Sequence, residues 1–275
     1  MSAYTITKNA IIKYAKQCWF SGATLPIERD FILNILISEL YQTTFSKMLV
    51  FKGGTALKKV FFGKKYDSYR FSKDLDFNII KDVSKDSIEN LMSELIERVD
   101  MKYGLRFERV GWIVEGDYGE GSLAVKIKLR DKGFVFAENV RIKFDFAIRP
   151  NFDTPYEEYG IENHYKEYLP IEIKCLSETI ESIFYWKFVA MFGGQRRTES
   201  KDLFDIISIL DAKLVSNEVA REIFQQFDAQ IWESRKATLQ KQWDIFFRDQ
   251  LPRNPDFQKY MGAYESYLKR FKSIP

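Results

Sequence analysis

Cysteine, histidine and long apolar runs are scarce in this chain. Its 275 residues contain two cysteines, Cys18 and Cys175, and one histidine, His164. Two cysteines exclude a disulfide scaffold and a four-cysteine zinc site, and they suit a reducing compartment. A single histidine excludes most histidine-dependent mechanisms. Because no apolar run could span a bilayer and the first residues do not resemble a signal peptide, we expect a cytoplasmic protein.

The chain also lacks a strong excess of charge of either sign. Lysine and arginine number 42 and aspartate and glutamate 39, which gives a formal net charge of +3. Binding to a nucleic acid would therefore depend on local basic patches. Hydrophobic residues make up 45% of the chain, enough for real cores without disulfides or structural metals.

Apolar spacing divides the chain into a mixed N-terminal half and a helical C-terminal half. A short apolar run at 48–51 predicts a buried strand, and further strand-like segments lie at 75–80, 105–114, 122–130 and 139–148. Helical spacing is found at 4–20, 26–40, 55–62 and 87–103. The C-terminal helices are predicted near 177–193, with Ser177 as N-cap, and near 200–213, 216–228, 236–249 and 255–271. The passage from 150 to 170 has no clean period, so we place a boundary there, between 1–150 and 151–275. This predicts an α+β fold of two lobes, a mixed β-sheet with flanking helices followed by a helical bundle.

A glycine pair follows the first predicted strand. Gly53 and Gly54 precede the short helix 55–62, and glycines at such a place let backbone N–H groups approach phosphate oxygens. Glycine pairs are also ordinary turn residues, so the pair alone does not decide the function. The pattern is not a P-loop, because Gly63-Lys64 is followed by Lys65 where a P-loop has a hydroxyl residue.

Two aspartates lie at the start of the next predicted strand. Asp74 and Asp76 are two residues apart, so their side chains share the face opposite the apolar residues. Two carboxylates near a core edge favour a Mg²⁺ or Mn²⁺ site, and an exposed edge or turn is the alternative. Asp145, on the polar face of the strand 139–148, is the candidate third ligand. A simple cross-strand ion pair would explain Asp145 almost as well.

Lys187 lies within the apolar row of the helix 177–193. One interpretation is functional: the lysine projects a cation towards a phosphate, or it is desolvated and has a lowered pKa. The alternative is snorkelling, in which the alkyl chain packs in the core and the ammonium reaches water. Asp202 and Asp205 lie one turn apart at the start of the next helix, where an acid is also explained by the helix dipole.

Basic side chains alternate along two of the predicted strands and recur before the helix 200–213. They line either a groove for a triphosphate or RNA, or a solvated face. These residues are Lys126, Lys128, Arg130, Arg141, Lys143 and the run Gln195-Arg196-Arg197.

Four stretches together resemble the AbiEii/AbiGii toxin family of nucleotidyltransferases, part of the DNA polymerase β-like superfamily. They are Val50 to Leu57, Arg70 to Phe77, the helix with Lys187, and Lys201 to Asp205. The resemblance implies a two-lobed enzyme that uses an NTP and a divalent metal, Mg²⁺ or Mn²⁺. It also implies a toxin that acts beside a cognate antitoxin, and MenT-type relatives modify tRNA.

The resemblance also implies a role for each matching residue. Lys52, Gly53, Gly54, Thr55, Ser72 and Lys187 would bind the nucleotide. Asp74, Asp76, Lys187 and Asp202 would be catalytic, with Asp74 and Asp76 as metal ligands. Asp145 is the third predicted ligand because of its place on the polar face of its strand, not because of a family motif. The acceptor would be RNA, such as the acceptor stem of a tRNA, or a protein. The alternatives are a noncatalytic nucleotide- or RNA-binding module on the same fold, and an interaction protein whose helical half docks a partner.

Overall fold

The computed structural model describes residues 7–17, 24–63, 70–105, 107–115, 123–131, 141–149, 152–192, 200–247, 250–251 and 254–272. The chain divides into two compact units, Met1–Glu178 and Thr179–Pro275. The division falls later than the boundary predicted near residue 150. Two strands that the sequence pattern did not predict, β6 (Tyr156–Ile161) and β7 (Ile173–Glu178), belong to the sheet of the first unit.

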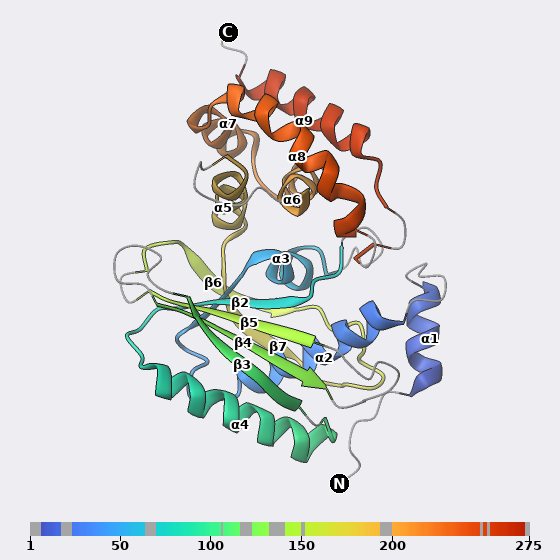
Figure 1. The fold of residues 1–275 in the computed structure, drawn as a ribbon, viewed down its shortest axis with the longest axis vertical. Helices are drawn as coiled ribbons and strands as arrows, with labels where there is room; N and C mark the ends of the chain where they lie inside the picture. The colour runs from blue at the N-terminus through green and yellow to red at the C-terminus, as the bar shows by residue number, and fades with distance from the viewer. Residues whose placement is uncertain are drawn as a thin grey trace. The chain divides into compact units, whose positions relative to one another are not determined.

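A mixed sheet forms the centre of the first unit (Figure 1). Its described strands are seven, in the order β3-β4-β5-β2-β1-β7-β6. Besides β6 and β7 they are β1 (Leu49–Lys52), β2 (Asp74–Ile79), β3 (Phe107–Glu115), β4 (Leu123–Asp131) and β5 (Arg141–Ile148). Strand β2 lies between an antiparallel neighbour, β1, and a parallel neighbour, β5. The mixed sheet and its helices confirm the predicted α+β class.

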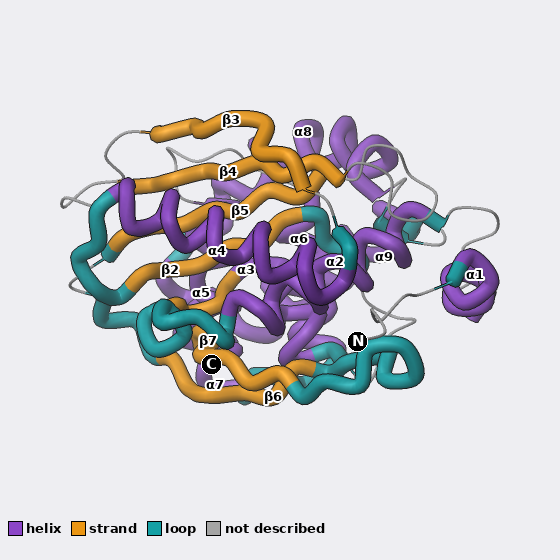
Figure 2. The backbone as a smooth tube through the Cα atoms, turned by 90° about the horizontal axis from the view of Figure 1, so that it is seen from below, coloured by secondary structure: helices purple, strands orange, loops and turns teal. Residues whose placement is uncertain are grey.

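Helices lie on both faces of this sheet. Helix α4 (Lys85–Tyr103) crosses one face with α2 (Leu25–Leu40) packed beside it, as Figure 2 shows, and α1 (Lys8–Gln17) precedes them. On the other face, α3 (Gly53–Ala56) continues into a π-helical turn, η1 (Leu57–Phe61). Helix α4 begins where Ser84 Oγ accepts a hydrogen bond from Ser87 N, and it ends at Gly104, whose φ is +67°.

Aromatic rings fill the core beneath α2 and α4. Phe51, Phe77 and Phe146, from three adjacent strands, stack with ring centroids 5.1 and 5.7 Å apart. All three are fully buried. Because side chains alternate along a strand, burying these rings sends their sequence neighbours to the opposite face, where α3 lies.

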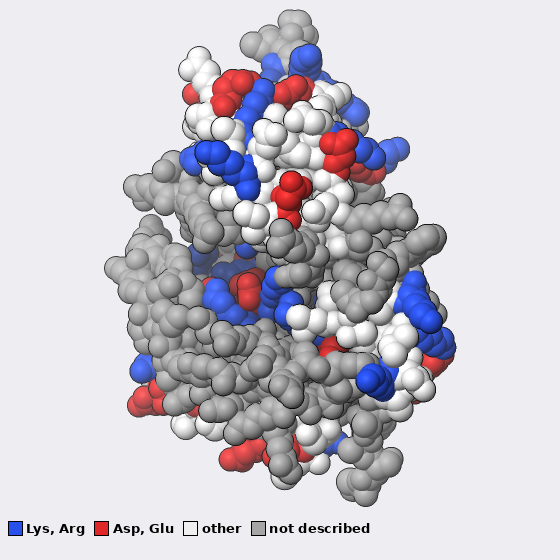
Figure 3. Space-filling view, turned by 45° about the vertical axis from the view of Figure 1, so that its right-hand side comes forward, with Lys and Arg blue, Asp and Glu red and all other residues white. Residues whose placement is uncertain are grey.

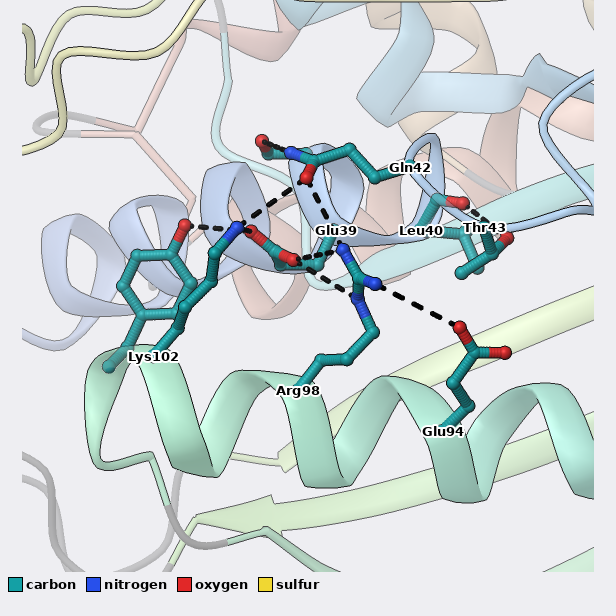
Figure 4. Close-up of polar contacts among 9 residues, drawn as sticks. Glu39, Leu40, Gln42, Thr43, Glu94, Arg98 and Lys102 are labelled. Atoms are coloured by element: carbon teal, nitrogen blue, oxygen red, sulfur yellow. Dashed lines mark hydrogen bonds and ion pairs between the residues drawn. The ribbon is translucent and has the colours of Figure 1, made fainter.

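Glu39 joins α2 to α4, although its carboxylate is buried (Figure 4). Its oxygens lie 3.0 Å from Arg98 Nη2 and 2.7 Å from Lys102 Nζ, and the Tyr103 hydroxyl donates to Oε1 at 2.9 Å. Burial by itself would raise the pKa of Glu39, but these hydrogen bonds lower it below its ordinary value. The carboxylate is therefore ionised and fixes the position of α4 on the sheet.

A second buried ion pair joins α2 to η1. Lys59 Nζ lies 2.8 Å from Asp30 Oδ1, and the Tyr165 hydroxyl donates to Asp30 Oδ2 at 2.9 Å. Burial alone would raise the pKa of Asp30, but the charges of Lys59 and Lys58 and these hydrogen bonds lower it to about 2. Since η1 continues α3, the pair fixes the helix that begins at the glycine pair.

Helices make up the second unit in the part of the chain that the structure describes. They are α5 (Ile180–Phe192), α6 (Ser200–Asp211), α7 (Asn217–Gln226), α8 (Ala229–Phe247) and α9 (Phe257–Lys272). Aromatic contacts such as Trp232 with Tyr264, at 4.2 Å between centroids, form its core. The predicted cap Ser177 is wrong, because Ser177 lies in β7 and Thr179 Oγ1 accepts the bond from Ser182 N instead. Among the described helices, none has the length and apolar character needed to cross a membrane.

Replacing Lys59 with Met should lower the free energy of unfolding by about 3–5 kcal/mol, because it leaves Asp30 charged and buried without its main partner. The matched change Lys102→Met, at a half-exposed lysine that shares Glu39 with two other donors, should cost less than about 1 kcal/mol. Denaturant unfolding measures both. Equal losses from both variants would contradict this account.

The ion pair also predicts a pH dependence of stability. Because the pKa of Asp30 is about 2 when folded and 3.8 ordinarily, its contribution to the free energy of unfolding is complete above pH 4 and is lost as the pH falls towards 2.

Candidate active site

The glycine pair turns the chain from β1 into α3, and each glycine leaves room for a different side chain. Gly53 has a φ of +75°, which favours glycine, and a Cβ there would lie 2.7 Å from Asp76 Oδ2. A Cβ on Gly54 would lie 2.3 Å from Arg70 Nη2. The two glycines therefore let a carboxylate and a guanidinium pack directly against the backbone of the turn.

Thr55 and Ser72, both predicted to bind nucleotide, hold the turn to β2. Their side chains are buried, and Thr55 Oγ1 lies 2.5 Å from Ser72 Oγ. Thr55 Oγ1 also contacts the carbonyl oxygen of Asp74. The structure thus places the glycine turn and the aspartate strand side by side, and the two hydroxyls are part of what joins them.

The three predicted metal ligands lie at neighbouring positions of one sheet face. Asp76 is the register partner of Lys52 on β1 and of Asp145 on β5, and Asp74 is the partner of Lys143. The three aspartates are neither buried nor fully exposed. Within the described residues, however, no three carboxylate, histidine or cysteine side chains converge into a ready-made ligand set.

Lys143 lies among these carboxylates. Its Nζ is 3.1 Å from Asp145 Oδ2, so Asp145 has an ion pair, but the partner lies two residues away on β5 itself and not on another strand as the alternative for Asp145 required. Desolvation lowers the pKa of Lys143, but the charges of Asp145, Asp74 and Asp76 raise it by more, and the net shift is upward. The electrostatic environment made by these carboxylates therefore favours a positive charge.

The structure adds two functional candidates, Asn78 and Glu178, to those that the sequence predicts. Lys52 Nζ donates to Asn78 Oδ1 at 2.6 Å, and Asn78 Nδ2 donates to Glu178 Oε1 at 2.6 Å. Asn78 follows Asp76 by two residues on β2, so strand alternation could have placed it on the site face. Glu178 ends β7, a strand that the sequence pattern did not predict.

Lys187 lies in the second unit, buried between α5 and α6. Its Nζ is 2.8 Å from both Asp202 Oδ1 and Asp205 Oδ2. The ammonium therefore meets two buried acids, not water as snorkelling requires. Asp202 is a first-turn acid of α6, as predicted, but its carboxylate is also a partner of Lys187. Asp205, which is fully buried, completes the cluster.

The predicted basic rows are only partly visible. The side chains of β4, the side chain of Arg141 and residues 195–197 lie outside the described residues. On the face that Figure 3 shows, the described acidic and basic side chains are interspersed.

Comparison with known proteins decides the family. The model of a family described as nucleotidyl transferase AbiEii toxin, type IV toxin–antitoxin system, matches residues 35–270. The chain belongs to the AbiEii family. It is therefore a nucleotidyltransferase of a toxin family, which implies an NTP substrate and a cognate antitoxin, and enzymes of this kind generally use a divalent metal.

Solved structures agree with the fold of this AbiEii chain. JHP933 from Helicobacter pylori is 19% identical with a TM-score of 0.54, over 90% of this chain and 91% of that protein. A second H. pylori protein, described as a candidate nucleotidyltransferase, is 17% identical with a TM-score of 0.52, over 89% of this chain and 93% of its own. Curated proteins gave no match.

Gly53→Ala should stop nucleotidyl transfer in the AbiEii chain, because the new Cβ would push Asp76 aside. Gly104→Ala is the matched control, since φ is also positive there and nothing lies within 4 Å of the added Cβ. Both variants should lose about 1 kcal/mol of unfolding free energy from backbone strain. Only Gly53→Ala should lose transfer, by about a hundredfold or more. If Gly104→Ala loses as much transfer activity as Gly53→Ala, backbone strain alone explains the loss.

Lys187→Met should destabilise the AbiEii chain by about 3–5 kcal/mol, because two buried acids lose their cation. Replacing all three members of the cluster with apolar residues, Lys187→Met, Asp202→Leu and Asp205→Leu, should recover much of that loss. Thermal unfolding measures the role of the cluster in stability, and a transfer assay on the same samples measures its role in catalysis. If the triple variant keeps full transfer activity, the cluster is structural only.

Proposed function

We propose that this enzyme transfers a nucleotidyl group from an NTP to RNA, such as the acceptor stem of a tRNA, at the acidic face of β2 and β5. The observation that carries the proposal is the register that sets Asp76 beside Asp145, with Asp74 two residues away and the glycine turn against Asp76. Acids next to a phosphate-binding turn are what transfer from an NTP requires. The RNA acceptor itself is supported by the resemblance to MenT-type relatives.

The residues present fit a divalent cation such as Mg²⁺. Asp74, Asp76 and Asp145 offer hard carboxylate oxygens, the ligands that Mg²⁺ prefers, and the raised pKa of Lys143 supports an environment that attracts positive charge. We propose these three as the ligands. When bound, the ion would stabilise charge on the attacking and leaving oxygens of the reaction.

The other residues of the site would bind and orient the NTP. The backbone of Gly53 and Gly54 would approach the phosphates, with Lys52 contributing a positive charge beside them. Thr55 and Ser72 would act by holding the shape of this turn, given their mutual contact. Lys187 and Asp202 are included in the catalytic set by the family motif.

The reaction is an in-line displacement at the α-phosphorus. A hydroxyl oxygen of the acceptor forms a bond to that phosphorus, the bond to the bridging oxygen of the β-phosphate breaks, and pyrophosphate leaves. Asp145, on the half-exposed face, is the proposed base that takes the hydroxyl proton.

Asp76→Asn should abolish labelling of RNA by a labelled NTP while the protein keeps its fold, since the side chain of Asp76 is not part of the buried core. Asp82→Asn, at an exposed aspartate just after β2, is the matched control and should be active. The assay incubates purified protein with each labelled NTP, Mg²⁺ and total RNA, and circular dichroism checks the fold. Near-normal labelling by Asp76→Asn would refute the assignment, and label on a protein would replace RNA as the acceptor.

A further inference from the structure

We propose that Asn78 and Glu178 are positioning residues that hold the Lys52 ammonium for contact with the polyphosphate of the NTP. The inference rests on the proposed function and deepens it. It adds two side chains, from β2 and β7, that the three-carboxylate site does not include.

The three side chains form a hydrogen-bonded chain across three adjacent strands. Lys52 Nζ donates to Asn78 Oδ1, and Asn78 Nδ2 donates to Glu178 Oε1, each at 2.6 Å. Asn78 is fully buried and Glu178 almost so. An asparagine that donates with one end and accepts with the other has one orientation only, so both of its neighbours are fixed.

Asn78 keeps the lysine from being neutralised by a direct ion pair. Among the described residues, Lys52 Nζ has no carboxylate within ion-pair distance, and its single hydrogen-bond partner is Asn78. An ammonium has three N–H donors, so two are available to a ligand. Lys52 is also the register partner of Asp76 and the residue directly before Gly53. The donors therefore lie where the glycine turn and the carboxylates meet.

The electrostatics agree with this geometry. Burial lowers the pKa of Lys52 below its ordinary value, although Glu178, Asp76 and Asp145 counteract it, and burial raises the pKa of Glu178. Both shifts mean that each charge is incompletely compensated in the folded chain. An anion bound next to Lys52 would reduce the free-energy cost of burying the lysine's charge, which is the property expected of a phosphate-binding lysine.

A second buried hydrogen bond on the same strands allows a purely structural role to be tested. Ser177, the neighbour of Glu178, is fully buried and donates to the carbonyl oxygen of Phe51, the neighbour of Lys52. This bond also joins β7 to β1 but does not involve the Lys52 ammonium. Ser177→Ala therefore controls for loss of a buried hydrogen bond at this place.

The test compares Asn78→Leu, Lys52→Ala, the double variant of these two, and Ser177→Ala. For each, the RNA-labelling assay gives kcat and KM for the NTP, and calorimetry gives Kd for a non-hydrolysable NTP analogue with Mg²⁺. We expect Asn78→Leu and Lys52→Ala each to raise KM and Kd at least about tenfold. The double variant should be no worse than Lys52→Ala, because both changes remove one interaction. Ser177→Ala should bind as the wild type does.

Additive losses in the double variant, or an Asn78→Leu enzyme with the Kd of Ser177→Ala, would overturn the positioning role while leaving the proposed function intact. Wild-type protein that neither binds the analogue nor labels RNA would overturn both. If Asn78→Leu does not fold, Asn78→Ser serves in its place, because serine is polar but too short to reach both Lys52 and Glu178.

Discussion

The pairing of β2 between β1 and β5 is the constraint on which the rest of the molecule depends. Its register stacks the rings of Phe51, Phe77 and Phe146 on the face that α2 and α4 cover. The residues next to these rings in the sequence, Lys52, Asp76 and Asp145, therefore come together on the opposite face, where α3 lies. A slip of one residue would exchange the two faces of β2. Core packing and active-site geometry are thus set by one interaction, so the hydrophobic effect that stabilises the sheet also keeps the acids together.

Three acids at neighbouring positions repel one another, and lysines held in fixed positions nearby offset part of this repulsion. Lys143, two residues before Asp145, pairs with it directly. Lys52 is instead hydrogen-bonded to Asn78, which donates in turn to Glu178, a carboxylate outside this set. The two lysines differ in consequence. Lys143 stabilises the carboxylate set itself, whereas under the proposed function Lys52 would keep N–H donors for the polyphosphate of the NTP. A site arranged in this way can tolerate its acids without losing its ability to bind a polyphosphate.

Much of this could be predicted from the sequence, and the failures have physical reasons. The alternation in β2 and β5 is strict because one face is buried, so the acidic face was predictable from Asp74, Asp76 and Asp145. The sequence pattern does not predict β6, because β6 is an exposed edge strand with two glutamates in its first half, where no hydrophobic pattern is required. Because the sequence pattern predicts neither β6 nor β7, it assigns Ser177 as a helix cap and gives no reason to connect Glu178 with Lys52. The spacing of Lys187 predicted its inward direction, but its partners lie on another helix and helical period carries no information about them.

The residues that would touch substrate are few, and most of the polar atoms around them are used to fix their positions. Thr55 and Ser72 bond to each other, Arg70 packs on Gly54, and the buried pair of Asp30 with Lys59 holds the helix that continues the glycine turn. Each of these groups is buried, and each would cost free energy if its partner were lost. A catalytic site gains from such support, because a phosphate held to within a fraction of an ångström reacts much faster than one held loosely. The burial of polar groups around the turn is therefore best understood as preorganisation, obtained at the expense of a simpler apolar core.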